Sequence, residues 1–375
     1  LAAEGVVFDN AVSTCPVCSP YRSMLVTGRH PQTTGHVLNF VDARCDELSI
    51  ADAFRNAGYR TGWSGKWHLA VGSWPGGAMD EGGEGPCYVP EGRPRLGFEY
   101  WRAYNFHEQY FNGWVNKDNW RNEKWEGYET DALNRYAFEF MDQAGDKPFC
   151  LFLSPHQPHK TCCGPSAPDA YYDRLPSELS VPENVPEASR EEAAAMYRDY
   201  LAMTLTLDDM VGEMLDYLDR TGLSENTLFV FTSDHGSQIG GLGKQVWEKG
   251  YTYEESLRVP LIVRGPKGFS GGIRRDTLIA PVDYFPSLCS LCGVPIPRTV
   301  EGRDLSAAMC GETGAFEQEA VLAMGFVDNY CFLNPPSVSS SGKQPWRGVR
   351  TKTHCYSRYL DGRKELFDLE IDPLQ

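Results

Sequence analysis

The residues best suited to chemistry lie near the start of the chain, where Cys18 is followed by Ser19, Pro20 and Arg22. Ser19 before Pro20 predicts a helix with Ser19 as its N-cap and Pro20 as its first residue. Cys18 would then lie at the mouth of this helix, where free N–H groups and the positive end of the helix dipole favour an anion. Arg22, one turn further on, could offer the same anion two parallel hydrogen bonds. The pattern therefore indicates a sulfur nucleophile, or the precursor of a nucleophile, beside an anion site.

A lone cysteine before a helix is usually only a small buried apolar side chain. Here the pattern is longer, because Cys18-x-Pro20-x-Arg22 is followed by a matching run at residues 25–29. Together these residues resemble the signature of the sulfatase family, within the alkaline phosphatase superfamily, in which the cysteine is oxidised after translation to formylglycine. The chain is similar to arylsulfatases and to choline-sulfatase-like bacterial enzymes. Cys15 lacks the residues that follow Cys18, so we expect it to be structural.

Length and charge narrow the class of protein. With 375 residues, of which 41% are hydrophobic, the chain can build one large core or a large domain with a small companion. A formal charge of −16 without a basic stripe argues against a nucleic acid or an anionic membrane as partner. No apolar run is long enough to span a bilayer. An acidic enzyme that binds an anionic substrate must therefore gather its positive charge locally.

Two predicted strands end in groups that could hold an anion, and the first strand covers residues 59–63. It leads to Lys66 and His68, which alternate with Trp67 and therefore face the same side of an extended chain. Ligand groups gather at the carboxyl ends of strands in open α/β sheets, although a solvated sheet edge by itself explains such a pair better. Gly-Lys-Trp-His resembles the sulfatase motif whose lysine and histidine contact sulfate and formylglycine, and this resemblance favours the catalytic interpretation.

The second strand is the continuous apolar run at residues 148–154, which predicts burial on both faces of a parallel sheet. It is followed by His156 and His159, and sulfatases place a sulfate-contacting histidine here. The local Pro-His-x-Pro pattern fits His156, whereas the distance from the start of the strand fits His159 better. We expect His159 to be catalytic, and we keep His156 as a substrate-binding candidate. One of the two histidines is expected to be structural. The sequence departs from the family at Lys160-Thr161, where a proline is common.

A candidate metal site follows a third apolar strand, predicted over residues 227–233, which ends in Asp234-His235-Gly236. A carboxylate suits hard cations, and a neighbouring imidazole can add a nitrogen ligand. Taken alone, the tripeptide fits a turn at least as well. In the sulfatase context it resembles the second pair of metal ligands. The resemblance therefore implies that Asp234, His235 and the matured Cys18 bind Ca²⁺, or Mg²⁺ in its place.

A further cation is expected from the segment that precedes an apolar strand at residues 258–263. This segment resembles the family region that holds a second sulfate-binding lysine. Counting back from Tyr253-Glu254 favours Lys249, and Lys244 keeps a lesser claim as a substrate-binding residue because comparable family loops differ in length. Without the resemblance, either lysine would be expected to be a solvated residue on the surface.

The order of elements favours an α/β fold. The resemblance implies a mostly parallel central sheet flanked by helices, as in alkaline phosphatase, and a small C-terminal α+β subdomain with an antiparallel sheet. We expect the catalytic domain at residues 1–310 and the subdomain at 311–375, each of them incomplete. Residues 72–130 are rich in aromatic residues and glycine with weak periodicity, which favours long binding loops. Helices are predicted at residues 48–57, 130–144 and 189–221.

The resemblance also implies a mechanism. Formylglycine hydrates to a geminal diol, of which one hydroxyl, activated by the metal, attacks sulfur and expels the alcohol, and the other then ejects sulfate. Arg22 steadies the formylglycine. Four residues hold sulfate oxygens or protonate the leaving group: Lys66, His68, His159 and Lys249. An aspartate pair that completes the metal site would lie on a first core strand before residue 1, so we expect residues 1–375 alone to be inactive or nearly so.

The implied substrate is a sulfate monoester of a carbohydrate or of an aryl or alkyl alcohol. The implied partner is a formylglycine-generating enzyme or an anaerobic sulfatase-maturating enzyme. A phosphonate or phosphate ester hydrolase of the same superfamily is the alternative, because it can use the same cysteine motif. A non-catalytic glycan-binding relative is disfavoured because the nucleophile and the cationic residues are all present. The compartment stays open between periplasmic or extracellular and cytoplasmic.

Overall fold

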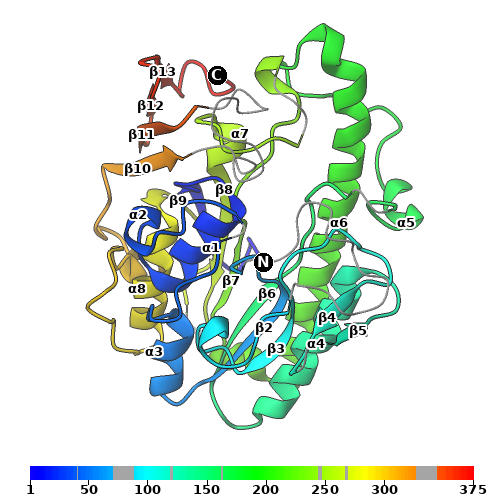
Figure 1. Ribbon diagram of the computed structural model, residues 1–375, viewed down its shortest axis with the longest axis vertical. Coiled ribbons are helices and arrows are strands. Elements are labelled where there is room, and N and C mark those ends of the chain that lie inside the picture. Colours follow the sequence, from blue (N-terminus) through cyan, green and yellow to red (C-terminus); the bar gives the residue numbers. More distant parts are fainter. Residues whose placement is uncertain are drawn as a thin grey trace. The chain divides into compact units, whose positions relative to one another are not determined.

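The computed structural model describes residues 1–39, 41–70, 88–118, 121–161, 164–243, 247–266, 269–326 and 344–375. The chain forms two compact units: unit 1 contains residues 1–39 and 223–375, and unit 2 contains residues 40–222 (Figure 1). The predicted site residues are divided between them. Unit 1 holds Cys18, Arg22, Asp234, His235 and Lys249, and unit 2 holds Lys66, His68, His156 and His159.

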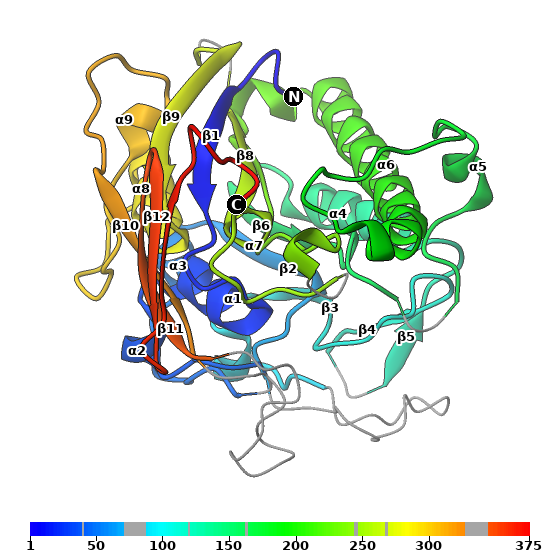
Figure 2. The same cartoon turned by 90° about the horizontal axis from the view of Figure 1, so that it is seen from above.

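Unit 1 is built on a four-stranded mixed sheet in the order β7-β8-β1-β9. β1 (Val6–Val12) pairs antiparallel with β8 (Arg258–Arg264) and parallel with β9 (Ile273–Ile279), and β7 (Phe229–Thr232) pairs antiparallel with β8. A buried apolar cluster joins these strands to the helices that lie beside β9 in Figure 2. The helices of unit 1 are α1 (Cys18–Thr27), α2 (Pro31–Thr34), α7 (Glu254–Leu257), α8 (Pro281–Leu291) and α9 (Ser306–Met309).

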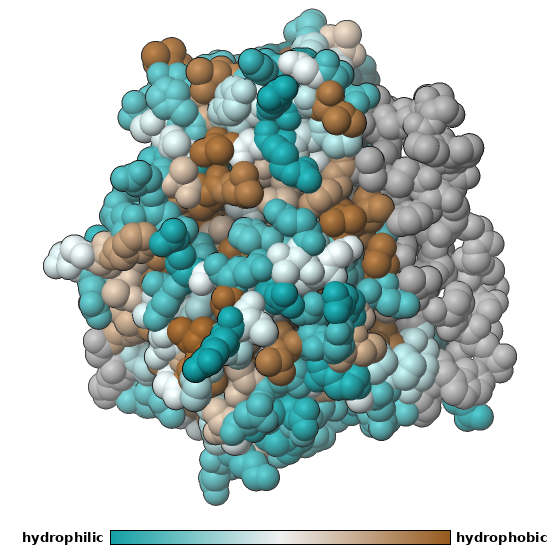
Figure 3. All heavy atoms as spheres, turned by 60° about the vertical axis from the view of Figure 1, so that its left-hand side comes forward, coloured by the Kyte–Doolittle hydropathy of each residue, from teal (hydrophilic) through white to brown (hydrophobic). Residues whose placement is uncertain are grey.

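The last four strands form the predicted antiparallel C-terminal sheet. They are β10 (Ala320–Gly325), β11 (Trp346–Thr351), β12 (His354–Tyr359) and β13 (Lys364–Asp368). One face packs on a second apolar cluster of unit 1, whereas the other is exposed and carries single apolar side chains among polar ones, a mixture that is also seen on the surface in Figure 3. The predicted domain boundary near residue 310 falls between α9 and β10.

Unit 2 contains a five-stranded sheet in the order β5-β4-β3-β2-β6. β2 (Arg60–Lys66) lies between β3 (Tyr100–Tyr104) and β6 (Phe149–Ser154) and is parallel to both, so the carboxyl ends of all three strands meet at one edge. β4 (Trp114–Asn116) and β5 (Asn122–Lys124) extend the sheet antiparallel. The segment predicted to be irregular therefore contributes three strands. The helices of unit 2 are α3 (Ile50–Asn56), α4 (Glu129–Ala144), α5 (Asp169–Tyr172) and α6 (Arg190–Thr221), and α4 and α6 run side by side (Figure 1).

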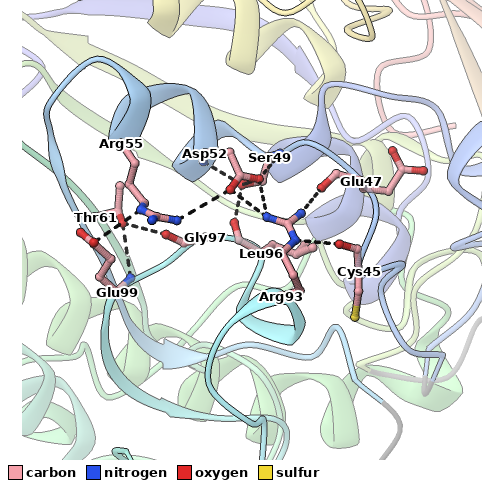
Figure 4. Close-up of polar contacts among 10 residues, drawn as sticks. All are labelled: Cys45, Glu47, Ser49, Asp52, Arg55, Thr61, Arg93, Leu96, Gly97 and Glu99. Atoms are coloured by element: carbon pink, nitrogen blue, oxygen red, sulfur yellow. Dashed lines mark hydrogen bonds and ion pairs between the residues drawn. The ribbon is translucent and has the colours of Figure 1, made fainter.

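The start of β2 is braced by a polar network (Figure 4). Ser49 and Asp52 form a capping box at the start of α3. Arg93 donates to both carboxylate oxygens of Asp52 at 2.8 and 2.9 Å. Thr61, in β2, donates to the Gly97 carbonyl at 3.0 Å. These contacts fix α3 and the entrance of β2, the strand whose other end carries Lys66.

The strands β6 and β7 differ from the prediction in their burial. Both are apolar runs, and burial on both faces was predicted for the run that forms β6, yet every residue in the two strands is only half-buried. Among the described residues each of them pairs with a single neighbouring strand, β2 for β6 and β8 for β7. Each unit thus has an apolar strand with one unpaired edge. Separately, no described helix is both long and apolar enough to cross a membrane.

Candidate active site

Cys18 is the first residue of α1, so the helix begins two residues before the predicted start at Pro20. The predicted N-cap was wrong: Val17, in extended backbone, takes that position. The backbone N–H of Ser19 donates instead to Oδ1 of Asn39 at 2.9 Å. Cys18, which is 1% exposed, therefore still lies at the positive end of the helix dipole.

The Cys18 thiol contacts the dipeptide that follows β7. Its Sγ lies 3.3 Å from Nε2 of His235, and Oδ1 of Asp234 lies 3.6 Å from the same nitrogen. Nδ1 of His235 is 2.8 Å from the Gly236 carbonyl, and because a carbonyl only accepts, Nδ1 must carry a proton and donate it. In the neutral ring, Nε2 therefore presents its lone pair toward Cys18 and Asp234. Metal-binding histidines are oriented in this way by a carbonyl or carboxylate on the other ring nitrogen.

These three side chains fit part of a metal site. One ligand atom from each of Cys18, Asp234 and His235 lies within 4.8 Å of the others. The carboxylate suits Ca²⁺ or Mg²⁺, and the imidazole is an additional nitrogen ligand. Ca²⁺ takes about six to eight oxygen ligands, so the site needs oxygen atoms beyond those of Asp234.

Arg22 is aimed at the same carboxylate. Its Nε and Nη2 donate to Oδ2 of Asp234 at 3.2 and 3.1 Å, and Arg22 is 7% exposed. The Ser13 hydroxyl donates to the backbone carbonyl of Asp234 at 2.5 Å. Removing one member of this partly buried ion pair leaves the other charge without its partner. Arg22 therefore fixes Asp234 beside Cys18.

The turn after His235 requires a glycine. The backbone N–H of Gly236 donates to the Ser256 carbonyl at 3.0 Å, and a Cβ on Gly236 would lie 2.0 Å from the Glu255 carbonyl oxygen. The two chain segments are therefore in backbone contact, which sets the position of His235.

Lys249 is half-buried on the segment that precedes α7. Its neighbour Gly250 approaches the start of α1, because a Cβ there would lie 3.7 Å from Cγ2 of Val17, the residue before Cys18. The chain at Lys249 thus runs past the end of α1 that carries the thiol. The competing candidate Lys244 lies outside the described residues.

In unit 2, the four other predicted residues surround a single aromatic ring, that of Phe106. Nζ of Lys66 lies 5.1 Å from the ring centroid. The imidazole centroids lie 4.8 Å (His68), 5.2 Å (His156) and 6.3 Å (His159) from the Phe106 centroid. The structure therefore brings together all four, from the ends of β2 and β6. His68 has a φ of 56°, so the extended alternation predicted for it and Lys66 ends with β2.

Lys66 and His156 form a direct pair. Nζ of Lys66 lies 3.0 Å from Nε2 of His156, and the two residues are 2% and 4% exposed. Burial, followed by the charge of Lys66 and the neighbouring histidines, lowers the pKa of His156 well below its ordinary value. The ring is therefore neutral and accepts a hydrogen bond from the ammonium group.

His159 is the more accessible of the two candidate histidines, with 23% of its side chain exposed. Its ring centroid is 4.7 Å from that of His156, and its Nδ1 lies 3.6 Å from Oε1 of Glu108. Both imidazoles belong to one group, and the choice of His159 over His156 as the sulfate ligand stays a prediction.

A glycine permits the close approach of the two strands that carry these residues. Gly65 has a φ of 95°, and a Cβ on it would lie 2.2 Å from the Ser154 carbonyl oxygen. β2 and β6 therefore touch through their backbones one residue before Lys66. A larger residue at position 65 would push the Lys66 and His156 segments apart.

The contribution of β3 was not predicted from the sequence. Its end supplies Phe106, the residue at the centre of the unit 2 group, together with Tyr104 and His107. The available signal was the aromatic run at residues 100–104 followed by polar and aromatic residues. That run lies inside the segment taken as irregular, so its strand end was not recognised.

The sulfatase family profile matches residues 1–294 of this chain, and the profile for the C-terminal region of N-sulphoglucosamine sulphohydrolase matches residues 243–375. The chain therefore belongs to the sulfatase family, and it is an enzyme that hydrolyses sulfate esters. Along its full length it is 33% identical to an ulvan-active sulfatase from Formosa agariphila, of which it covers 70%.

The solved structures agree on the fold. A Bacteroides thetaiotaomicron structure described with a locus for the metabolism of multiple glycosaminoglycans has a TM-score of 0.85 and 25% identity, with 100% of this chain and 82% of that one covered. A phosphonate monoester hydrolase from Silicibacter pomeroyi has a TM-score of 0.73 at 18% identity, with 98% and 83% covered. The predicted α/β fold class, with helix-flanked sheets and a C-terminal antiparallel sheet, is confirmed. The predicted mostly parallel central sheet is replaced by two mixed sheets, one in each unit.

Proposed function

We propose that the substrates of this sulfatase are sulfate monoesters carried by glycans. The relative from Formosa agariphila acts on ulvan, and the Bacteroides structure comes from a study of glycosaminoglycan metabolism. The proposal of catalysis rests on the 3.3 Å contact between Cys18 Sγ and His235 Nε2 at the start of α1. It supports a site in which the modified Cys18 is the nucleophile.

In unit 1, the proposed roles follow from the contacts. Cys18 is converted to formylglycine by a maturing enzyme, either a formylglycine-generating enzyme or an anaerobic sulfatase-maturating enzyme, and its hydrate attacks sulfur. Asp234 and His235 hold Ca²⁺, or Mg²⁺ in its place, with the matured residue 18 as a further ligand. The cation supplies positive charge that stabilises anionic oxygen atoms during the reaction. Arg22 orients Asp234 through its two hydrogen bonds.

The remaining residues bind the sulfate group. Sulfate ester hydrolysis develops negative charge on the sulfate and on the leaving oxygen, so preorganised donors lower the barrier. The Lys66 ammonium is already oriented by His156, and His159 has the exposure needed to reach a ligand. His68 and Lys249 complete the proposed set, and one of these groups protonates the leaving alcohol.

A second proposal concerns the completeness of the metal site. Asp234 is the only carboxylate among the described ligand candidates for this site, whereas Ca²⁺ takes about six to eight oxygen ligands. This difference supports additional aspartate ligands supplied by chain outside residues 1–375. Residues 1–375 alone would then show little or no turnover even with a matured Cys18.

The reaction class is tested on the full-length protein co-expressed with a maturing enzyme. Aryl sulfate, aryl phosphonate and sulfated oligosaccharides are assayed in parallel. We expect turnover of both sulfate esters, with a higher kcat/KM for oligosaccharides than for the aryl sulfate. Faster turnover of aryl phosphonate than of every sulfate ester would replace the proposal with a phosphonate hydrolase.

The same preparation tests catalysis against glycan binding alone. The peptide that contains Cys18 is analysed by mass spectrometry after co-expression. We expect the aldehyde form, whereas a fully unmodified cysteine together with binding of sulfated glycans and no turnover would show a non-catalytic glycan-binding relative.

A further inference from the structure

Lys249 lies on a segment whose conformation depends on contacts with other parts of unit 1. Residues 247–253 form neither helix nor strand. Trp247 has a φ of 68° and Gly250 a φ of 86°, and the first value is one that non-glycine residues rarely adopt. Backbone of this kind persists only where the surrounding structure imposes it. The position of Lys249 is therefore set by the neighbours of its segment.

On one side, the segment is bonded to the chain that follows His235. The N–H of Trp247 donates to the Gln238 carbonyl at 2.7 Å, and the N–H of Gln238 donates to the Glu248 carbonyl at 2.8 Å. The Gln238 side chain, which is 0% exposed, donates to the Ser256 hydroxyl at 3.3 Å. The segment and the turn after the candidate metal ligand therefore share their hydrogen bonds.

On the other side, alternate residues of the segment are held by the C-terminal sheet. Nε1 of Trp346, in β11, donates to the Gly250 carbonyl at 3.0 Å. The Thr252 hydroxyl lies 3.1 Å from the Tyr359 hydroxyl of β12 and 3.1 Å from Oε2 of Glu365 in β13. These contacts begin at the residue directly after the predicted sulfate-binding lysine.

An ion pair with the same sheet holds the end of the segment, at the start of α7. Nε and Nη2 of Arg350, in β11, donate to the two carboxylate oxygens of Glu254 at 2.8 and 2.9 Å. The two side chains are 3% and 13% exposed. Nη2 of Arg350 also donates to Oδ1 of Asn10, in β1, at 3.1 Å. Bidentate charged hydrogen bonds of this kind fix the geometry as well as the contact.

Attachment of the sheet to unit 1 is provided separately by apolar packing. The buried face of the sheet belongs to an apolar cluster that includes Val12, Met24 and Leu257, and apolar burial is non-directional. A satisfied buried polar network adds rigidity and a unique geometry. The polar contacts therefore account for the precise placement of the segment rather than for the attachment of the sheet.

We propose that the C-terminal sheet positions Lys249 for sulfate ester hydrolysis, with Trp346 as the positioning residue that acts through the Gly250 carbonyl. The Arg350–Glu254 pair holds the far end of the same segment. The inference rests on the proposed function, because the position of Lys249 matters only if this lysine binds the sulfate group. Trp346 is 4% exposed and acts through the backbone of the segment.

The test is a double-mutant cycle of Trp346→Phe and Lys249→Ala in the matured full-length protein, with kcat/KM measured for a sulfate ester. Phenylalanine keeps a buried aromatic ring but lacks the N–H. We expect Trp346→Phe alone to lower kcat/KM about tenfold, because a small displacement of a binding group slows the reaction. In the Lys249→Ala protein the same substitution should change kcat/KM less than about twofold, because the lysine through which Trp346 acts is gone.

Lys352→Met is the matched control at the end of the same strand. Lys352 forms ion pairs with Asp276, at 3.0 Å, and with Glu317, and both partners lie outside residues 247–257. We expect this variant to keep the wild-type kcat/KM, with circular dichroism and denaturant unfolding as checks on folding. An equal fall in kcat/KM in Lys352→Met and Trp346→Phe would show a general loosening of the sheet and overturn the proposal.

Additive losses in the cycle would also overturn it, because Trp346 would then act independently of Lys249. If Trp346→Phe does not fold, Thr252→Val and Thr252→Ser replace it, since valine removes the hydroxyl that contacts the sheet and serine keeps it. We expect Thr252→Val to be non-additive with Lys249→Ala, and Thr252→Ser to stay near wild type. Equal losses in the valine and serine variants would contradict the proposal.

Two results concern the basis of the inference. Wild-type kcat/KM in Lys249→Ala would remove this lysine from the site and refute the inference, while sulfate ester turnover itself would stand. Wild-type protein without sulfate ester turnover would instead refute the proposed function.

Discussion

The two groups of predicted catalytic residues differ in the kinds of side chain that they contain. In unit 1, a thiol, a carboxylate and an imidazole lie within 4.8 Å of one another, at one helix start and one strand end. In unit 2, one ammonium group and three imidazoles surround the Phe106 ring at the ends of parallel strands. In the proposed function, the first group supplies a nucleophile precursor and metal ligands, and the second supplies hydrogen-bond donors for the sulfate group.

In the proposed function, this difference explains how an acidic chain binds an anionic substrate. The formal charge of −16 would repel a sulfate ester in general. The chain concentrates Lys66 in a buried group where neighbouring aromatic and imidazole rings exclude water, so each electrostatic contact is stronger than at the surface. We therefore expect substitutions in unit 1 to abolish the chemical step, and substitutions in unit 2 to weaken it in graded amounts.

The largest effect is expected from Cys18→Ala. Without residue 18 as a formylglycine precursor, kcat should fall at least about 1,000-fold, because a covalent nucleophile cannot be replaced by binding alone. Cys15→Ala, three residues away and equally buried, should keep most of the activity. Turnover assays with circular dichroism as a folding check measure both, and comparable activity in Cys18→Ala and wild type would remove the unit 1 group from the mechanism.

Metal removal comes next. Dialysis of the matured full-length protein against a chelator should lower kcat at least about 100-fold, because the charge that stabilises the reacting oxygens is lost. Ca²⁺ should restore activity, and Asp234→Asn should raise the Ca²⁺ concentration needed for half-recovery. Full activity in the chelated protein, with the metal content verified by elemental analysis, would show that Asp234 and His235 have another role.

Gly65→Ala tests how the unit 2 group depends on strand packing. The new Cβ meets the Ser154 carbonyl, so we expect a loss of about 2 kcal/mol in the free energy of unfolding and a weaker sulfate affinity. Gly212→Ala, inside α6 with open space around it, should instead raise stability by about 0.5–1 kcal/mol. Denaturant unfolding measures the stability of both variants. Equal changes in the free energy of unfolding would mean that β2 and β6 tolerate separation.

The smallest effect is expected from Arg22→Lys. Lysine keeps the charge but loses the two-pronged contact with Asp234, so kcat/KM should fall about tenfold and KM should change little. Steady-state kinetics on an aryl sulfate measure this. A rise in KM without a change in kcat would show that Arg22 binds the substrate rather than orienting Asp234.

The positions of several candidate residues at strand ends could be predicted from the sequence. Strand ends marked a set of polar residues as candidates, and the resemblance to the sulfatase family favoured a catalytic interpretation over a solvated edge or a turn: Lys66, His68, His156, His159 and Asp234-His235. Phe106 was missed for a physical reason. β3 is an aromatic strand in a segment without clear periodicity, so no local pattern marks its end.

The helix start shows the same limit on a smaller scale. Ser19-Pro20 fits an N-cap by local preference, yet α1 begins at Cys18 and the backbone N–H of Ser19 donates to the side chain of Asn39, 20 residues away. Local propensity is a weak guide wherever a tertiary hydrogen bond competes with it. The thiol was correctly predicted to lie at the start of the helix. Its exact position in the first turn was predicted wrongly.

The most direct test of the central claim is the aldehyde content at residue 18 in preparations of different activity. Full-length protein is produced with increasing amounts of the maturing enzyme, the fraction of the residue 18 peptide that reacts with a hydrazide is measured, and sulfate ester turnover is measured on the same samples. We expect turnover to rise in proportion to the aldehyde fraction and to vanish with it. Full turnover in a preparation whose Cys18 is entirely a free thiol would contradict the account.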